Sequence, residues 1–429
     1  MSGHSALIVF TRYPQPGMAK TRLIPELGAE GAAALQRRMT LHTVGRASAF
    51  CMGERDARLI VAHEGGDAAL MSEWLGPLTF VPQGPGDLGE RLQRAARQAF
   101  DDGAGVVILI GTDCPCLSEA ALSSAFTAVH LHHLVFGPAA DGGYYLAGLD
   151  HPELVSVFAG IPWSTSSVLT ASINASIAAG HAPGLLATLP DVDEPPDLPG
   201  ALAELDAAER VSVIIPALNE SENLARLLPK LKAAAPWEII IADGGSTDDT
   251  AAVAASAGVR HLLTPRGRAA QMNTAAKDAT GGFLLFLHAD TVPPENFCEV
   301  IRRTLEMPGT AAGAFTFRLN EPFHGRELIE WGVALRCRHR NLPYGDQGLF
   351  LRRSLFSATG GFPEWPILED VEYVRMLRER GRIVTVPEAV LTSSRRWQNG
   401  GILRTFLRHQ LILAGHAMGI SPERLAEWR

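Results

Sequence analysis

The strongest constraint on this sequence is a repeated alternation of short apolar runs with stretches of helical periodicity. Apolar runs that predict buried strands lie at 6–10, 57–62, 106–111 and 133–138 in the first half, and at 211–217, 238–243, 283–290 and 313–319 in the second. The intervening stretches 34–50 and 90–100 carry apolar residues at helical spacing. Strands that alternate with helices predict an α/β fold in which a mostly parallel sheet is covered by helices on both faces.

Chain length indicates that this pattern is divided between two domains. A chain of 429 residues is too long for one ordinary core and suits two domains of about 200 residues each. The segment 189–210 is rich in proline and acidic residues, and a strong predicted strand starts directly after it at Val211. We therefore predict two α/β domains, 1–205 and 206–429, each a Rossmann-like, mostly parallel sheet flanked by helices.

Composition and charge exclude several classes of protein. The formal net charge of -8 argues against a nucleic-acid partner. Five cysteines are too few and too scattered for a disulfide scaffold. The first residues lack the pattern of a signal peptide, and no apolar run reaches the length of a membrane span. We expect a cytoplasmic protein.

Three aspartates follow apolar strands at the positions where ligands bind in open α/β sheets, beyond the carboxyl ends of the strands. They are Asp113, Asp243 and Asp290. An aspartate at a strand end is also a common cap or turn residue, so each one alone leaves both interpretations open. Three of them, two in one half, favour a binding site.

The segment 238–258 places a carboxylate beside the start of a helix. Asp243 ends the predicted strand, two glycines follow it, and Ser246, Thr247 or Asp248 is expected to cap the next helix. Backbone N–H groups at a helix start suit phosphate, and the carboxylate suits a base or ribose, so this motif fits a nucleoside diphosphate. A capped helix with no ligand is the alternative.

Two further segments of the second half carry groups suited to metal binding and proton transfer. His288 and Asp290 are predicted to point the same way along one strand, where they can hold Mg²⁺ or Mn²⁺ against a diphosphate. Glu369 and Asp370 are predicted to start a helix whose dipole favours ionised carboxylates, which suits a general base. Ordinary acids of a first helical turn are the alternative.

Taken together, the motifs IPALNE, DGGSTDDT, RGRAAQMN, GDQGLFLRR and GGFPEWPILEDVEY, in this order over about 211–400, resemble the family 2 glycosyltransferases. The resemblance implies a GT-A fold and an inverting transfer from a nucleotide sugar to an acceptor hydroxyl. It implies that Glu220 and Asp243 contact the nucleoside, that Arg268 contacts phosphate, that Asp290 holds the metal and that Asp370 deprotonates the acceptor. The acceptor and diphosphate side would carry Asp346, Gln347, Arg396 and Trp397.

The sequence departs from the family pattern in two places. His288-Ala289-Asp290 stands where the family usually has paired aspartates, and Asn273-Thr274-Ala275 stands where it usually has Asn-x-Gly. The first departure bears on the identity of the metal.

The first half carries its own candidate site. Lys20 and Arg22 offer positive charge after the first strand, and Asp113 and Asp193 are the carboxylates that we pair on a metal. The motifs KTRL, TDCP, DGGYYL and DVD, over about 5–198, resemble small nucleotidyltransferase-like proteins similar to the guanylyltransferases of molybdopterin and 2-phospholactate. The resemblance implies that Lys20 and Arg22 bind a nucleoside triphosphate, and that a sugar phosphate attacks it beside Mg²⁺.

Together the two halves predict a bifunctional enzyme that makes a nucleotide-activated sugar and then transfers the sugar. A first half that only binds nucleotide or serves as a scaffold is the alternative. A dinucleotide-binding oxidoreductase is disfavoured, because no G-x-G-x-x-G motif follows either opening strand.

The tail segment 401–420 is predicted to form an amphipathic helix. Its apolar side carries Leu403, Leu407, Leu411, Ala414 and Met418. Such a helix can pack on its own domain or lie on a membrane surface near a lipid acceptor.

Overall fold

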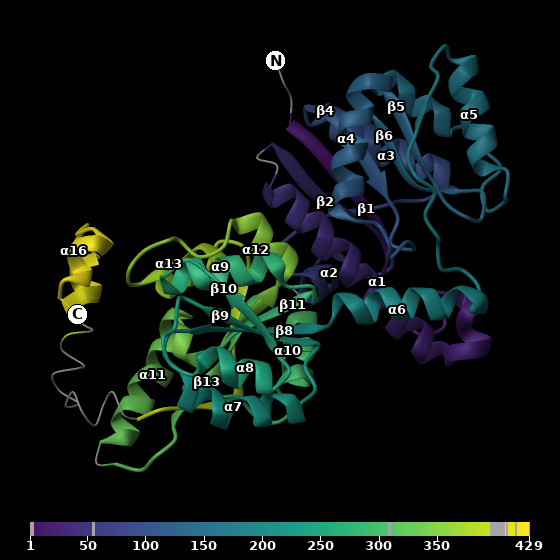
Figure 1. Cartoon of the computed structure of the whole chain (residues 1–429). Coiled ribbons are helices and arrows are strands. Elements are labelled where there is room, and N and C mark those ends of the chain that lie inside the picture. The colour runs from purple at the N-terminus through teal and green to yellow at the C-terminus, as the bar shows by residue number, and fades with distance from the viewer. Residues whose placement is uncertain are drawn as a thin grey trace. The chain divides into compact units, whose positions relative to one another are not determined.

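A computed structural model describes residues 4–53, 56–307, 310–323, 325–394, 408, 411–416 and 418–428. The chain splits into two compact units, Met1–Ala208 and Glu209–Arg429 (Figure 1). Each unit contains one sheet with helices packed on it, which confirms the predicted α/β class.

The first unit is built on a seven-stranded sheet with the order β3-β2-β1-β4-β6-β5-β7. Strands β1, β2, β3 and β4 pair in parallel, whereas β6 runs antiparallel to both of its neighbours. The strands are β1 (His4–Arg12), β2 (Ala57–Glu64), β3 (Thr79–Pro82), β4 (Ala104–Ile110), β5 (Leu134–Pro138), β6 (Tyr144–Leu149) and β7 (Gly184–Leu185). The helices are η1 (Thr21–Leu23), α1 (Ile24–Gly53), α2 (Ala68–Leu75), α3 (Leu88–Asp101), α4 (Glu119–His132), η2 (Pro152–Phe158), α5 (Val168–Ala178), η3 (Pro195–Asp197) and α6 (Leu198–Ala208).

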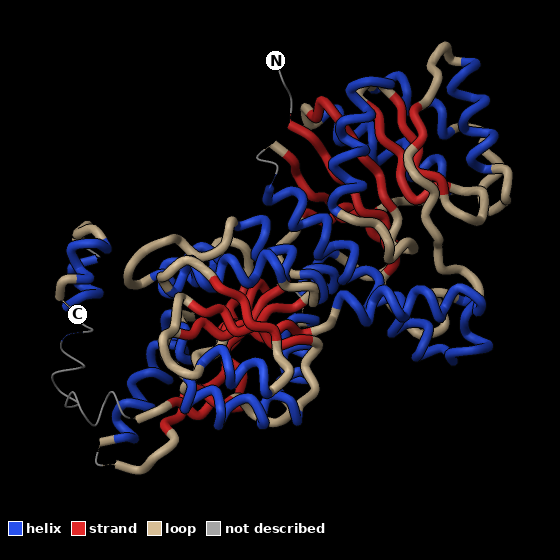
Figure 2. The backbone as a smooth tube through the Cα atoms, viewed as in Figure 1, coloured by secondary structure: helices blue, strands red, loops and turns tan. Residues whose placement is uncertain are grey.

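Both faces of this sheet are covered, as the helices on either side of the strands in Figure 2 show. Leu7 and Val9 of β1 pack in one core with residues of α1, α2 and α4. Ala6 and Ile8, which alternate with them, pack in a second core with residues of α3 and η2. Since both sets of side chains are buried, β1 is apolar along its whole centre rather than at every second position.

The proline-rich segment before residue 209 folds onto the first unit. Val192, Leu198 and Leu205 are buried in a small core with Leu23 and Met39. The segment therefore ends in an ordinary packed helix, α6, rather than in an extended connection.

The second unit has an eight-stranded sheet with the order β10-β9-β8-β11-β14-β13-β15-β12. Strands β10, β9, β8 and β11 are parallel, and β14 runs antiparallel between β11 and β13. The strands are β8 (Val211–Ala217), β9 (Glu238–Asp243), β10 (Arg260–Leu263), β11 (Phe283–Phe286), β12 (Thr291–Val292), β13 (Thr310–Leu319), β14 (Leu349–Arg352) and β15 (Arg382–Thr392). The helices are α7 (Ser221–Ala233), α8 (Thr250–Ser256), α9 (Arg268–Asp278), α10 (Phe297–Glu306), α11 (Arg326–Arg340), η4 (Gly345–Gln347), α12 (Arg353–Thr359), α13 (Glu369–Arg378) and α16 (Pro422–Ala426).

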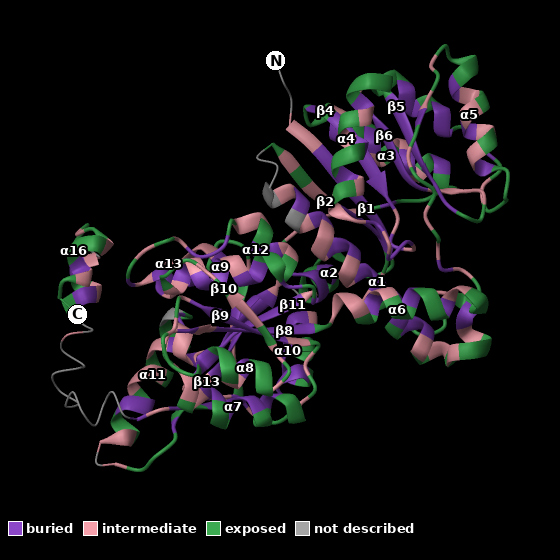
Figure 3. Cartoon of the chain, in the orientation of Figure 1, coloured by how far each residue is buried: buried purple, intermediate pink, exposed green. Residues whose placement is uncertain are grey.

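Helices also cover both faces of this second sheet, and its central strands β8, β9 and β11 are buried (Figure 3). Val213 and Ile215 of β8 share a core with residues of α7 and α10. Helix α9 packs on β8 and β9 and carries Arg268 at its first position. None of the described helices is long and apolar enough to cross a membrane. Half of the predicted amphipathic helix over 401–420 falls outside the described residues, which leave out Leu403 and Leu407, whereas Leu411, Ala414 and Met418 of its apolar side are described and exposed.

Two local expectations are wrong. The apolar run 283–290 is a strand only to Phe286. The Leu287 N–H donates one further hydrogen bond to the Ile214 carbonyl, and the chain then turns. In this turn the Thr291 N–H donates to the His288 carbonyl at 3.1 Å. His288 and Asp290 therefore lie in a turn and not along a strand. Helix α8 begins at Thr250 after Asp249, so none of the three expected residues occupies its N-cap position.

Candidate active site

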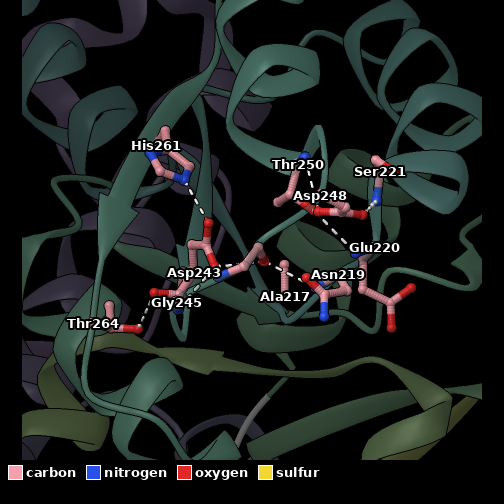
Figure 4. Close-up of polar contacts among 12 residues, drawn as sticks. Ala217, Asn219, Glu220, Ser221, Asp243, Gly245, Asp248, Thr250, His261 and Thr264 are labelled. Atoms are coloured by element: carbon pink, nitrogen blue, oxygen red, sulfur yellow. Dashed lines mark hydrogen bonds and ion pairs between the residues drawn. The ribbon is translucent and has the colours of Figure 1, made fainter.

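The loops that follow β8 and β9 are joined by side-chain hydrogen bonds (Figure 4). The Asn219 carboxamide oxygen accepts from the Thr247 N–H at 2.8 Å, and the Asn219 N–H donates to the Ser246 hydroxyl at 2.9 Å. The Glu220 N–H donates to the Thr250 hydroxyl at 3.0 Å. These contacts fix the two loops to each other at the carboxyl end of the sheet.

Asp243 anchors this arrangement. One carboxylate oxygen accepts from Gly245 N–H, Ser246 N–H and the Ser246 hydroxyl at 3.1, 2.8 and 2.7 Å. The other oxygen lies 2.8 Å from Nε2 of His261 on β10. Burial acts to raise the pKa of Asp243, but the hydrogen bonds from His261, Ser246 and Gly245 outweigh it and lower the pKa.

A cavity of about 380 Å³ opens at the carboxyl ends of β8 and β11. Its lining brings together residues that lie far apart in the chain and were predicted as site residues: Glu220, Arg268, His288, Asp290, Asp346 and Glu369. Carboxylates, a guanidinium and an imidazole thus face one space, which suits a charged and metal-bridged ligand.

Asp370 lies beside a second cavity, of about 170 Å³, whose lining shares Arg268, His288, Asp346 and Glu369 with the first. Its carboxylate accepts from the Gly345 N–H at 2.6 Å and from the Val371 N–H at 2.8 Å. A Cβ atom on Gly345 would lie 3.1 Å from the Asp370 carboxylate and 3.3 Å from Nε2 of His288. Glycine at this position therefore lets the two side chains approach the same point.

Glu369, the first residue of α13, is 3% exposed and forms an ion pair with Arg268 at 3.1 Å. Burial and the neighbouring Asp370 raise the pKa of Glu369, against the opposing effect of Arg268. Leu368, directly before it, has the left-handed backbone angle φ 63°. The carboxylates of Glu369 and Asp370 thus begin the helix as predicted, but they have different partners.

Some predicted residues lie elsewhere. Gln347 is buried, with its oxygen accepting from Arg336 and from the Tyr344 N–H and its amide donating to the Phe315 carbonyl. It supports the fold beside the cavities rather than facing a ligand. Arg396 and Trp397 lie outside the described residues.

Three residues that line or support the site were missed. Arg266 lines the larger cavity with an exposed side chain, two positions before Arg268 in the same RGR motif. Gln271 donates to the carbonyls of Ala217 and Ala242, both at 2.8 Å, and so holds the ends of β8 and β9. The RGR motif contained the signal for Arg266, whereas the role of His261 depends on the pairing of β10 with β9.

The first unit also gathers its predicted residues at the carboxyl end of its sheet. Nζ of Lys20 lies 2.8 Å from Asp113 and 3.2 Å from Asp193, and Arg22 lies 3.4 Å from Asp193. Burial acts to lower the pKa of Lys20, but the two carboxylates raise it. Asp113 and Asp193 thus share an ammonium group, where a shared metal was expected.

Three carboxylates of this unit also lie close to one another. Oxygens of Asp141, Asp191 and Asp193 lie within 4.8 Å of one another. Burial, together with the negative charges of Asp141 and Asp193, raises the pKa of Asp191. Asp193 therefore belongs to both groups, whereas Asp113 belongs only to the Lys20 contact.

Comparison with known proteins gives different results for the two units. The family described as "Uncharacterized protein conserved in bacteria (DUF2064)" matches residues 48–165, and the family "Glycosyl transferase family 2" matches residues 212–362. A PGL/p-HBAD biosynthesis glycosyltransferase of Mycobacterium bovis (strain BCG / Pasteur 1173P2) is 38% identical over 226 residues, which are 48% of this chain and 84% of that protein. Through its second unit, the chain belongs to the family 2 glycosyltransferases.

Two other similarities are partial. An undecaprenyl-phosphate 4-deoxy-4-formamido-L-arabinose transferase of Sodalis glossinidius (strain morsitans) is 33% identical over 163 residues, 31% of this chain and 50% of that protein. The chain thus spans about half the length of that relative. The crystal structure of glucosyl-3-phosphoglycerate synthase from Mycobacterium tuberculosis with Mn²⁺ and uridine diphosphate aligns at a TM-score of 0.37 and 20% identity, over 51% of this chain and 84% of that one.

Proposed function

We propose that the second unit transfers a sugar from a nucleotide-diphosphate sugar to an acceptor hydroxyl with inversion at the anomeric carbon. The observation that carries this proposal is the cavity at the strand ends, where Glu220, Arg268 and Asp290 face the same space. The adjoining cavity adds Asp370, so a donor site and a basic carboxylate lie next to each other.

The donor is assigned to the larger cavity. Glu220 and the loop held by Asp243 and Ser246 are proposed to contact the nucleoside, since they lie where the parallel strands end. Arg268 and Arg266 are proposed to bind the diphosphate, because guanidinium groups match phosphate oxygens in charge and geometry.

Mg²⁺ or Mn²⁺ is the proposed cofactor, and the residues of the cavity fit it. His288, Asp290 and Asp346 line the space, but among the described residues they do not converge as tightly as the three carboxylates of the first unit. One or two protein ligands completed by diphosphate oxygens and water is the usual arrangement at such sites. An imidazole nitrogen suits Mn²⁺ better than Mg²⁺, which prefers oxygen. When bound, the ion neutralises charge on the leaving diphosphate.

Asp370 is proposed to take the proton from the acceptor hydroxyl. The acceptor oxygen then forms a bond to the anomeric carbon while the bond from that carbon to the diphosphate oxygen breaks, and the nucleoside diphosphate leaves with the electron pair. The N–H groups of Gly345 and Val371 orient the Asp370 carboxylate. The neighbouring Glu369 is paired with Arg268, so Glu369 is not assigned the role of base. Contact of the segment 401–420 with a membrane stays a prediction, because half of that segment lies outside the described residues.

A panel of nucleotide sugars with Mn²⁺ tests the proposal in two measurements. The donor should raise the melting temperature, and the folded chain should release nucleoside diphosphate when an acceptor is present. Asp370→Asn should lower turnover by about 10²–10⁴-fold while the melting shift stays near that of wild type. Glu295→Gln is the matched control, since Glu295 is an exposed carboxylate of the same unit and lines neither cavity. Wild-type turnover in the Asp370 variant would remove this residue from its role.

We further propose that the first unit forms the nucleotide-activated sugar, or a related nucleotidyl product, from a nucleoside triphosphate and a sugar phosphate. The placement of Lys20, Asp113 and Asp193 together at the carboxyl end of its sheet supports this. A nucleotide-binding module without catalysis is the alternative. Pyrophosphate release from nucleoside triphosphate and sugar phosphate distinguishes these two possibilities.

A further inference from the structure

Two histidines and an aspartate form a cluster in the first unit that the proposed reactions do not use. Nδ1 of His133 lies 3.0 Å from one carboxylate oxygen of Asp150, and Nδ1 of His151 lies 2.6 Å from the other. The two imidazole rings meet edge to face with centroids 5.2 Å apart. One donor atom from each residue lies within 4.8 Å of the other two.

The backbone presents these three side chains from fixed positions. His133 ends α4 in the left-handed conformation, with φ 62°, and Leu134 directly after it pairs with Leu149. This register places His133 beside Asp150, whose N–H donates to the His133 carbonyl at 3.3 Å. Since the strands set the spacing of two of the three residues, little backbone rearrangement is needed for their side chains to share a ligand.

We propose that His133, Asp150 and His151 form a binding site for a divalent cation of the zinc type. Two imidazole nitrogens and one carboxylate oxygen are a donor set that Zn²⁺ accepts in a tetrahedral site, with water as the fourth ligand. On binding, each imidazole carries its proton on Nε2 and presents the Nδ1 lone pair to the metal. Both imidazole side chains are at least 50% exposed, so the cation can enter directly from solvent.

The neighbouring histidine on α4 does not belong to this site. A Cβ atom on Gly184 would lie 2.7 Å from the imidazole of His132, so that ring packs against β7. The site therefore uses His133, which follows the last residue of α4 in the left-handed conformation.

The cluster is also separate from the proposed nucleotide site. It lies at the open end of the β5–β6 hairpin, whereas Asp141 lies in the turn that closes the hairpin between Pro138 and Tyr144. Asp113 is near that closed end too, because Ile110 at the end of β4 pairs with Leu146. A bound cation would join the end of α4 to the start of η2, and its expected effect is on stability.

Zinc and cobalt titrations of the full chain without a histidine tag test the proposal. Wild type should bind Zn²⁺, melt at a higher temperature with it, and give the d–d absorption of tetrahedral Co²⁺. His133→Asn, which tolerates the left-handed backbone, and His151→Asn should each weaken Zn²⁺ binding at least about 100-fold. His130→Asn, on the same helix, is the matched control and should bind as wild type does.

A second control separates the carboxylate group of the same unit. The double variant Asp191→Asn with Asp193→Asn should keep the Co²⁺ absorption, because those residues lie at the other end of the hairpin. Unchanged Zn²⁺ affinity and Co²⁺ spectrum in the folded His133 and His151 variants would overturn the proposal. So would the absence of Zn²⁺ binding by folded wild type at micromolar metal.

Discussion

The carboxylate of Asp243, which the sequence predicts to bind a nucleoside, forms its hydrogen bonds with other residues of the protein. Its two carboxylate oxygens accept from Gly245, Ser246 and His261, and the side chain is 3% exposed. The bonds to Ser246 hold the loop that meets Asn219 and the start of α7. At the residue scale, the contribution of Asp243 to a nucleotide site is therefore to shape the loop that surrounds the ligand.

The effect of Asp243 on stability should depend on pH. Because the folded-state pKa lies below the unfolded value of about 3.9, the ionised carboxylate stabilises the fold above that pH. This contribution is lost as the pH falls through the folded-state pKa. Asp243→Asn should lower the free energy of unfolding by about 1–3 kcal/mol at neutral pH, and the difference from wild type should shrink below about pH 4.

Urea unfolding of both proteins across this pH range measures the effect. Glu295→Gln is the control, since Glu295 is an exposed carboxylate of the same unit and its removal should cost little at any pH. A difference between wild type and the Asp243 variant that does not change with pH would show that the carboxylate charge is not the cause.

At the scale of single elements, apolar runs predict burial more directly than they predict hydrogen bonding. The sequence predicts one strand over 283–290, but Leu287 and Ala289 are buried in the core beyond the last strand residue. The apolar runs do not predict β3, β6, β7, β10, β12, β14 and β15, and two of these, β6 and β14, run antiparallel to both of their neighbours. Their places depend on partners far away in the sequence, which no local pattern contains.

The same limit applies to the site. Glu220, Arg268, Asp290 and Glu369 were recognisable because each lies at a strand end or a helix start, where an α/β fold gathers its ligands. Gln347 lies in the GDQGLFLRR motif, yet its side chain forms hydrogen bonds with Arg336 of α11 and with the Phe315 carbonyl of β13. The sequence therefore predicts which edge of the sheet carries the site. It does not distinguish a residue that lines the cavity from one that supports the surrounding fold.

One such support joins α9 to the loop that precedes α13. The buried Asn273 side chain donates to the Phe362 carbonyl at 2.8 Å and accepts from the Phe362 N–H at 2.9 Å. Asn273→Asp removes the donor and buries a carboxylate against that carbonyl. We expect a loss of about 2–4 kcal/mol in the free energy of unfolding, and a lower turnover because the loop leads to Asp370.

Denaturant titration and the transfer assay measure the two effects. Asn296→Asp makes the same chemical change at an exposed position before α10, and it should leave both quantities near wild type. A stable Asn273 variant would mean that the loop is held by its other contacts, such as the edge-to-face contact of Phe362 with Phe286 and its tilted ring contact with Tyr373.

At the scale of the whole molecule, the chain contains two units with separate cores and separate polar groups at the carboxyl ends of their sheets. Leu7 and Ile108 belong to a core of the first unit, and Val213 and Phe297 belong to the core of the second. The two family matches also fall in different units. If each unit has an activity of its own, a single substitution in one unit should leave the activity of the other unit unchanged.

Asp113→Asn is the substitution that tests this separation. It leaves Lys20 with one of its two carboxylates, and the substituted residue belongs to the first unit. If the first unit is a nucleotidyltransferase, wild type given nucleoside triphosphates and sugar 1-phosphates should release pyrophosphate, and the variant should do so about 100-fold more slowly. Transfer from a ready-made nucleotide sugar should be equal in the two proteins. Asp101→Asn, at an exposed position of α3, is the control for the charge change, and melting curves confirm folding.

Folded wild type that releases no pyrophosphate with any substrate pair would leave the first unit a binding module. Loss of transfer in the folded Asp113 variant would contradict the independence of the two sites.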